Sequence, residues 1–282
     1  MRALKGSAWA FGGALSVALS AMTAMSASAQ EAVDVELVLA VDVSLSMSFE
    51  ELKIQRDGYT AALTHPDVVN AIRSGIHGKI VVTYFEWAGD ASQYMVVPWT
   101  VIASATDAEA VASKITATPP NSARRTSISG GLRYAHDLFA ESSFKGMKRV
   151  IDISGDGPNN QGEYVNLVRD DIIDQGIVIN GLPLMTDGGM ISSFDVADLD
   201  RYYNDCVIGG PGSFMIPVNS WEQFPEAIRR KLVLEIAGDP GRDWWQDAFR
   251  AAPEAVVRAA GYDCQVGEKR WRGRSWMWDD TR

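Results

Sequence analysis

The sequence predicts an α/β fold with three layers, in which a doubly wound, mainly parallel central sheet is covered by helices on both faces. Short apolar segments alternate with amphipathic ones along residues 30–237, and this alternation favours parallel strands joined by helices. The first apolar segment, Val35–Val41, is rich in β-branched residues, which is typical of a strand buried on both faces. Ligands of such folds bind beyond the carboxyl ends of the strands, so polar residues that directly follow strands are candidates for a site.

The first half of this region continues the alternation. Ser48 and Glu51 have the spacing of a capping box, which predicts that a helix begins there. Apolar residues then recur at helical spacing, namely Leu52, Tyr59 and Leu63. Two further strands are predicted at 79–87 and 94–99, followed by a helix at 108–116. The next helix has one apolar face, made of Ile128, Leu132, Ala135 and Phe139.

The second half has the same pattern. Strands are predicted at 149–154 and 177–182, with a helix at 163–174 between them. The run Gly209–Gly212 marks a turn before a last strand at 214–218. An amphipathic helix at 221–236 closes the domain. Residues 238–282 differ in composition and form a predicted appendage rich in tryptophan, with Trp244, Trp245, Trp271, Trp276 and Trp278. We expect these tryptophans to pack on the domain, the alternative being contact with an anionic polymer or membrane surface.

The first 29 residues have the three regions of a secretory signal peptide. Arg2 and Lys5 precede an apolar stretch, and small residues end it at Ala27-Ser28-Ala29. We expect cleavage after Ala29 and no membrane span thereafter, which predicts a periplasmic or secreted protein. An uncleaved membrane anchor is the alternative, because residues 6–25 carry no charge.

Composition narrows the functional classes. The formal net charge of −10 argues against nucleic acid as a partner. With only three histidines, widely spaced, a His-based zinc site is not predicted. The two cysteines, Cys206 and Cys264, are expected to form a disulfide in an oxidising compartment and to tie the appendage to the domain. Two buried, reduced thiols are the alternative.

A metal site is predicted where the first strand ends. The string Asp42-Val43-Ser44-Leu45-Ser46 places one carboxylate and two hydroxyls at alternate positions, and such oxygen ligands suit Mg²⁺, with Mn²⁺ or Ca²⁺ as alternatives. Thr126 opens a helix after a polar loop, and Asp156 follows the strand that ends at Ser154. The competing interpretation is that Asp42 and Ser44 cap a helix and Asp156 makes a turn.

These three motifs, in this order, resemble the metal-ion-dependent adhesion site of von Willebrand factor type A domains. The resemblance implies that Ser44, Ser46 and Thr126 contact a divalent metal while Asp42 and Asp156 hold its waters. It further implies that a vacant metal position accepts a carboxylate from a partner. The sequence departs from the wider superfamily at Gly155, where a threonine usually precedes the aspartate.

A narrower resemblance is to an uncharacterised bacterial family of exported type A-like proteins. It covers about residues 32–237 and is specific for the fold but silent on the partner. The motifs that carry it are Glu86-Trp87-Ala88-Gly89, Ile153-Ser154-Gly155-Asp156-Gly157-Pro158-Asn159-Asn160, Ile179-Asn180-Gly181-Leu182 and Gly209-Gly210-Pro211-Gly212.

Four polar residues at the same predicted edge are candidates for orienting the metal ligands and their waters, namely Glu86, Asn159, Asn160 and Asn180. Asparagines in loops rich in glycine and proline are equally expected as turn formers. Asp152 is different, because it lies inside a predicted buried strand, where an unpaired carboxylate is costly. It therefore needs a partner that the sequence does not identify.

Two rival sites compete with this one. Asp152, Ser154 and Asp156, with Glu163 at the twelfth position, fit the loop pattern of a helix-loop-helix calcium site, but the preceding residues read as strand. Asp42 also resembles the nucleophile of haloacid dehalogenase-type phosphatases, although Ser44 stands where the acid–base aspartate would be. We therefore expect a non-enzymatic, metal-dependent module that binds a protein or other carboxylate-bearing ligand, with the phosphatase as the alternative.

Overall fold

The computed structural model describes residues 30–186, 196–237 and 261–279. The predicted signal peptide and its cleavage site lie outside these residues, as do Trp244 and Trp245. Within the described ranges no helix is both long enough and apolar enough to cross a lipid bilayer.

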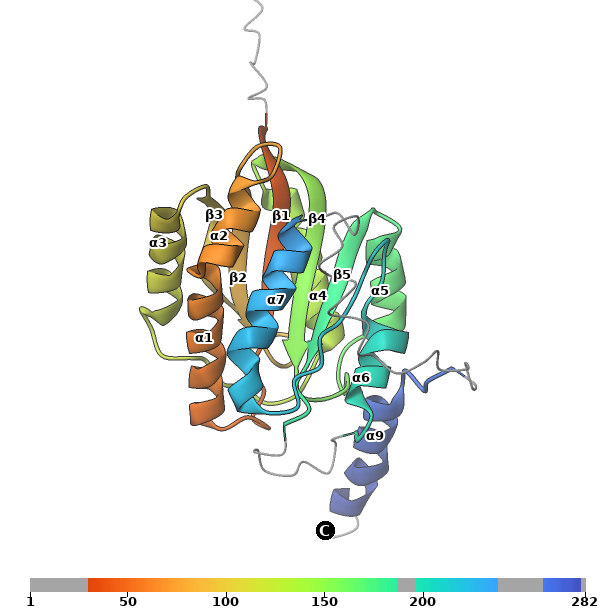
Figure 1. Ribbon diagram of the computed structural model, residues 1–282. Helices are drawn as coiled ribbons and strands as arrows, with labels where there is room; N and C mark the ends of the chain where they lie inside the picture. Colours follow the sequence, from red (N-terminus) through yellow and green to blue (C-terminus); the bar gives the residue numbers. More distant parts are fainter. Residues whose placement is uncertain (1–29, 187–195, 238–260, 280–282) are drawn as a thin grey trace, which may run out of the picture.

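The described residues form one sheet of five strands in the order β3-β2-β1-β4-β5 (Figure 1). Four of these strands are parallel to one another, namely β1 (Glu31–Asp42), β2 (Ile80–Trp87), β4 (Phe144–Gly155) and β5 (Ile177–Pro183). They form the neighbouring pairs β1–β2, β1–β4 and β4–β5. The edge strand β3 (Gln93–Ile102) runs antiparallel to β2. The prediction of a mainly parallel sheet is therefore confirmed.

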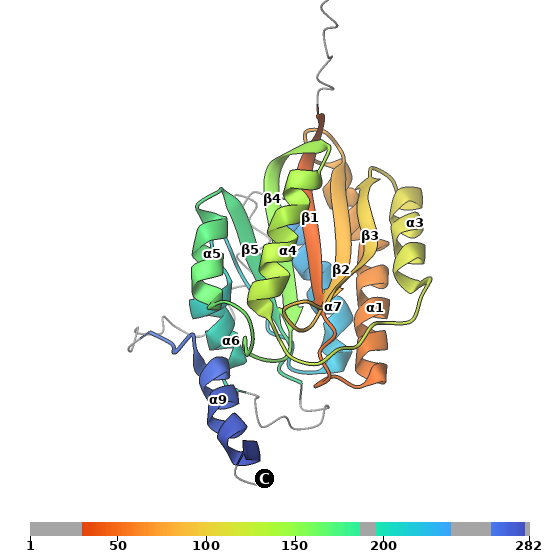
Figure 2. The same ribbon diagram turned by 180° about the vertical axis from the view of Figure 1, so that it is seen from behind.

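Helices cover both faces of this sheet, which confirms the three layers. One face is covered by α1 (Phe49–Leu63), α2 (Pro66–Arg73), α3 (Ala105–Thr116) and α7 (Phe224–Ala237). The opposite face, seen in Figure 2, is covered by α4 (Ile128–Glu141) and α5 (Val165–Ile173). The short α6 (Leu199–Tyr202) continues into a π-helical turn at Tyr203–Val207 on this second face, and a 3₁₀ turn at Trp221–Gln223 precedes α7.

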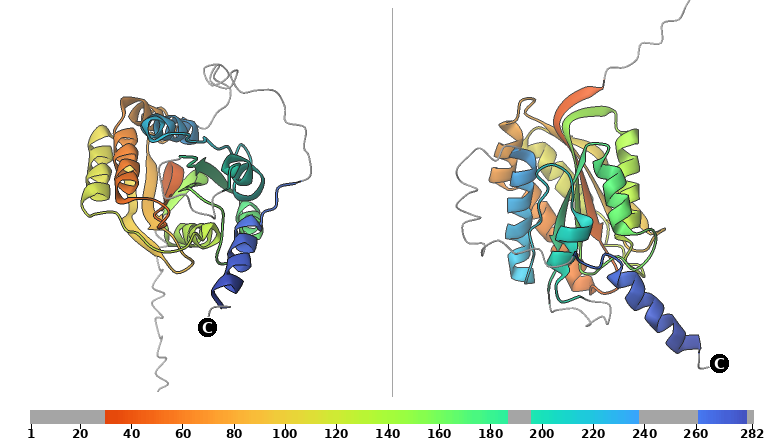
Figure 3. Two further views of the ribbon diagram at one scale, coloured as in Figure 1. Left: turned by 90° about the horizontal axis from the view of Figure 1, so that it is seen from below. Right: turned by 90° about the vertical axis from the view of Figure 1, so that its right-hand side faces the viewer.

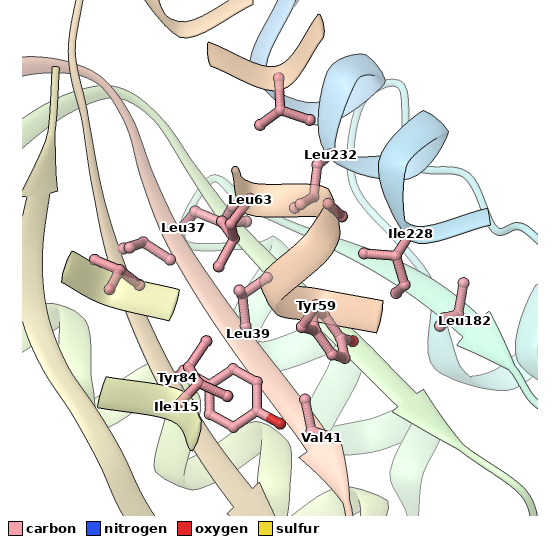
Figure 4. Packing of buried hydrophobic residues seen from close by; sticks show 14 of the residues in the cluster. Leu37, Leu39, Val41, Tyr59, Leu63, Tyr84, Ile115, Leu182, Ile228 and Leu232 are labelled. Atoms are coloured by element: carbon pink, nitrogen blue, oxygen red, sulfur yellow. The ribbon is translucent and has the colours of Figure 1, made fainter. Parts of the chain in front are cut away.

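Two apolar clusters, one on each face of the sheet, make up the core. The first contains Leu39 of β1, Tyr59 of α1 and Ile228 of α7, whose side chains lie between the sheet and these helices (Figure 4). All three are fully buried. Packing of this kind fixes the ends of the central strands, and those ends carry the candidate site.

Two segments differ from the sequence-based expectation. Helix α2 was not predicted, although Pro66 occupies its first turn and His65 caps it, which is a recognised start signal. The predicted strand at 214–218 is not continuous, although the segment runs parallel to β5 and the residue after it through isolated bridges at Met215 and Val218. The Ile216 and Val218 N–H groups donate to the Gly181 and Pro183 carbonyls, but Pro183 has no N–H to donate back to this segment, so the ladder is interrupted there.

The appendage is attached to the domain at several points. Cys206 of the π-helical turn forms a disulfide with Cys264, which confirms the predicted bridge. Helix α9 (Val266–Asp279) follows and lies at the carboxyl end of the strands (Figure 1). The Arg125 guanidinium lies 3.1 Å from the centre of the Trp271 ring, so this tryptophan packs on the domain as expected.

Candidate metal centre

Two neighbouring strands bring the predicted ligands together. Asp42 is the last residue of β1, Asp156 directly follows β4, and Val41 is registered against Ser154. Because the two strands are parallel and adjacent, their following loops begin at the same edge of the sheet. Figure 3, on the left, looks onto this end of the molecule.

The loop after β1 folds back on itself through hydrogen bonds. The Ser44 N–H donates to Asp42 Oδ1 at 2.7 Å, and the hydroxyls of Ser44 and Ser46 lie 2.9 Å apart. The Ser46 hydroxyl donates to Asp156 Oδ1 at 2.9 Å, and Ser44 Oγ lies 3.5 Å from the same oxygen. Four of the five predicted ligands therefore form one connected cluster of oxygens.

The start of α1 limits the length of this loop. Ser48 and Glu51 form the predicted capping box, with the Ser48 N–H donating to Glu51 Oε2 at 2.7 Å. Gln55, one turn further along the helix, donates to the Asp42 carbonyl at 3.2 Å. The loop is thus held between the strand end and the helix it leads into.

Thr126 reaches the same edge through its backbone. Its N–H donates to Asn160 Oδ1 at 3.1 Å, and the Asn160 N–H donates back to the Thr126 carbonyl at 2.8 Å. Arg125, immediately before it, has a φ of 78°, which is uncommon for a residue other than glycine. Ala123, earlier in the same loop, is hydrogen-bonded through its backbone to Val43 and Leu45. The Thr126 loop is therefore joined to the loop after β1 and, through Asn160, to the loop after β4.

Burial and charge both act on Asp42. Its side chain is fully buried, and this burial, followed by the charge of Asp156, raises the pKa of Asp42 well above its usual value. Hydrogen bonds from Ser44 oppose that rise. Among the described residues, Asp42 Oδ2 has no hydrogen-bond partner. A cation beside these two carboxylates would offset their repulsion and satisfy the remaining oxygen.

The donors therefore fit a hard divalent cation. Carboxylate and hydroxyl oxygens are the ligands that Mg²⁺, Mn²⁺ and Ca²⁺ accept. The described part of the chain contains no group of three or more His, Cys, Asp or Glu arranged for a metal ion. Ser44, Ser46, Asp42 and Asp156 are the residues that lie close enough together to hold such an ion.

Two of the four residues predicted to orient the metal ligands and their waters lie beside the Thr126 loop. Asn160 contacts Thr126 directly, as described above. Glu86 accepts from Arg56 Nε at 2.7 Å and from the Asn121 N–H and side-chain amide at 2.9 and 2.8 Å. Glu86 therefore shapes the loop that leads to Thr126, and its carboxylate is already paired.

Asn159 and Asn180 contact other parts of the molecule. Asn159 Oδ1 accepts from the Ser129 N–H at 2.9 Å, and its amide nitrogen donates to Glu268 of α9 at 2.8 Å. Asn180 donates to Glu235 of α7 at 3.0 Å and accepts from the Phe214 N–H at 3.0 Å. Asn159 thus joins the loop after Asp156 to the appendage, whereas Asn180 belongs to a second buried polar cluster.

This second cluster supplies the partner that Asp152 requires. Lys231 Nζ of α7 lies 2.7 Å from Asp152 Oδ1 and also pairs with Glu235, and all three side chains are fully buried. Lys231 and Glu235 occupy the apolar stripe of α7 beside Ile228 and Leu232, and that position was the signal that sequence reasoning missed. Because Asp152 lies in β4 and is paired with Lys231, the rival helix-loop-helix calcium loop at 152–163 is wrong.

A protein-family model described as "Protein of unknown function (DUF1194)" matches residues 32–240, which is well over half of the chain. Among curated protein sequences none matches significantly.

Solved structures with a similar fold include proteins described as adhesive or structural. The pilus adhesin SpaC from Lactobacillus rhamnosus GG is 13% identical with a TM-score of 0.54, covering 72% of this chain and 31% of that chain. Proximal thread matrix protein 1 from the mussel byssus, with a zinc occupied MIDAS motif, is 13% identical with a TM-score of 0.50, covering 74% and 49%. A von Willebrand factor type A protein from Catenulispora acidiphila is 10% identical with a TM-score of 0.48, covering 73% and 43%.

This chain thus spans about a third to a half of the length of these proteins. At such identities the likeness to the first two shows the fold alone. The fold is the von Willebrand factor type A-like fold that the sequence predicts.

Proposed function

The chain belongs to the DUF1194 family, and we propose that it is a metal-dependent binding module that engages a protein or other carboxylate-bearing ligand. The observation that carries this proposal is the cluster in which the Ser44 and Ser46 hydroxyls meet Asp156 beside an unsatisfied oxygen of Asp42. A metal held by these oxygens would leave a coordination position that an oxygen ligand of a partner can take.

Each residue has a distinct task in this proposal. Ser44, Ser46 and Thr126 hold a divalent ion through their hydroxyls, while Asp42 and Asp156 accept hydrogen bonds from its waters. When bound, the ion supplies the positive charge that a carboxylate of the partner contacts. The Ser44 N–H keeps Asp42 turned toward the loop, and Asn160 keeps Thr126 at the sheet edge.

The surface around the cluster supports a protein as the ligand. Leu45, between the two serines, is 51% exposed, and Phe49 at the start of α1 is 64% exposed. On the Asn160 side, a cavity of about 450 Å³ has Tyr164, Leu167 and Trp271 in its lining. Apolar side chains next to a polar centre are typical of surfaces that bind proteins.

The proposed location is the periplasm or the extracellular space. The disulfide between Cys206 and Cys264 is of the kind that persists in oxidising compartments. The names of the two similar proteins, a pilus adhesin and a byssus matrix protein, are in keeping with a role outside the cytoplasm.

Metal binding to the mature chain, residues 30–282, tests the proposal directly. Chelated protein is titrated with Mg²⁺, Mn²⁺ or Ca²⁺ while thermal unfolding is followed. A ligand that binds only the folded state raises the Tm with the logarithm of its concentration over Kd. We expect this shift in wild type and its loss in the double variant Ser44→Ala with Asp156→Ala. A double variant that responds as wild type does would show that the assigned site is wrong.

A matched control removes the same chemical groups elsewhere. Ser113 and Asp174 are exposed and belong to α3 and the end of α5, so Ser113→Ala with Asp174→Ala should keep the full metal response. The ligand class is tested by crosslinking and mass spectrometry in the native host. Partners that are recovered with metal, and lost both with chelator and in the site double variant, support the proposal.

A further inference from the structure

A slot beside the candidate metal site is built from two glycines on neighbouring strands. Gly155 ends β4, and Gly181 lies in β5 opposite Ile153. A Cβ added at Gly155 would lie 2.7 Å from Tyr203 Oη, and one added at Gly181 would lie 2.8 Å from Tyr203 Cδ1. Real Cβ atoms are not found so close to a neighbour, so the Tyr203 ring fills the space that both glycines leave.

The Tyr203 hydroxyl therefore lies beside Asp42. The Cβ position at Gly155 is 2.7 Å from Tyr203 Oη and 3.0 Å from Asp42 Oδ2, so both atoms border the same point. Both are fully buried, and neither has a hydrogen-bond partner among the described residues. Buried polar groups are normally paired, and a phenol O–H is a donor that suits a carboxylate acceptor.

Tyr203 is held in this place by its own segment. It begins the π-helical turn Tyr203–Val207, and its ring contacts that of Tyr202 at a centroid distance of 6.3 Å. Three residues further on, Cys206 anchors the turn through the disulfide to Cys264. Single π-helical turns are frequent at functional sites.

From this geometry we infer that Tyr203 is a positioning residue of the metal site. Its hydroxyl donates to Asp42 Oδ2 through one bridging water, while the Ser44 N–H already holds Asp42 Oδ1. With both oxygens fixed, Asp42 presents one orientation to the metal and its waters. This inference rests on the proposed function and adds to it a residue that the sequence motif does not contain.

The test compares the metal affinity of two tyrosine variants of the mature chain. Tyr203→Phe keeps the ring and removes only the hydroxyl. Tyr84→Phe is the matched control, because Tyr84 is also fully buried with a hydroxyl that has no partner among the described residues, but it lies in the other apolar cluster. Partners that orient metal ligands typically contribute 10- to 100-fold to affinity. We expect Tyr203→Phe to bind Mn²⁺ at least about tenfold more weakly, with Tyr84→Phe equal to wild type.

Two further readouts separate positioning from a merely structural effect. Mn²⁺ binding should perturb the tyrosine ultraviolet difference spectrum in wild type and in Tyr84→Phe, but not in Tyr203→Phe. Gly181→Ala, which displaces the Tyr203 ring while retaining its hydroxyl, should also weaken Mn²⁺ binding. Wild-type affinity in both Tyr203→Phe and Gly181→Ala would overturn the inference and leave the proposed function standing. A wild-type chain that binds no metal would overturn both.

Discussion

Replacing Lys231 by methionine should destabilise the protein strongly. Lys231 Nζ lies 2.7 Å from Asp152 Oδ1 and also pairs with Glu235, and all three side chains are fully buried. Methionine fills much of the same volume but leaves two buried carboxylates without a cation. Removing one partner of a buried ion pair typically costs about 3–5 kcal/mol. In a domain of this size each kcal/mol shifts the Tm by about 2–4 °C, so we expect a Tm lower by roughly 10 °C.

The loss should also depend on pH. Without the Lys231 ammonium, the pKa values of Asp152 and Glu235 rise further in the folded state, so folding then requires protons that become scarce as pH rises. Thermal unfolding of Lys231→Met should therefore show a larger deficit at about pH 8 than at about pH 5. Lys53→Met, which removes the same group from an exposed pair with Asp57, should leave the Tm unchanged. A Lys231→Met Tm equal to that of wild type at both pH values would refute the reasoning.

Three further predictions concern other parts of the fold. Burial, followed by the charge of Asp152, raises the pKa of Glu235 to about 7 from a usual value of 4.5. This raised pKa contributes stability that is fully present below about pH 4.5 and is lost as pH rises through about 7. Unfolding measured at a series of pH values should show this loss in wild type and a flatter pH profile in Glu235→Gln. Reducing the Cys206–Cys264 bridge, which closes a separation of 58 residues, should lower stability by about 4 kcal/mol in the chain-entropy model, and a reduced protein with an unchanged Tm would count against it. Glu86→Ala leaves Arg56 buried without its carboxylate and should cost about 3–5 kcal/mol in denaturant unfolding, with a milder loss in Glu86→Gln.

Local pattern was sufficient for the part of the fold that depends on neighbouring residues. The apolar run at Val35–Val41 predicts the central strand, and Ser48 with Glu51 predicts where α1 begins. The gathering of Asp42 and Asp156 was also foreseeable, because parallel neighbours end at the same edge of the sheet. In each case the decisive interaction lies within a few residues or follows from strand order alone.

Interactions between distant segments could not be predicted in this way. The partner of Asp152 is 79 positions later, on a helix whose rotation about its axis decides which side chains face the sheet. Tyr203 comes near Asp42 only because two glycines in β4 and β5 leave space for its ring. Neither arrangement has a signal in the spacing of residues, since both depend on how the sheet and helices pack.

The appendage is best understood as part of the framework of the site. Glu268 of α9 accepts from Asn159, in the loop that follows Asp156. Trp271, one turn further along α9, stacks with Arg125, the residue before Thr126. A single helix thus touches both of the loops that join the Asp42 loop at the sheet edge, and its anchoring disulfide is in the same π-helical turn as Tyr203. A change in the position of α9 would therefore shift the loops that carry Thr126 and Asp156, and with them the surroundings of Asp42. An appendage without these contacts would leave all three residues undisturbed.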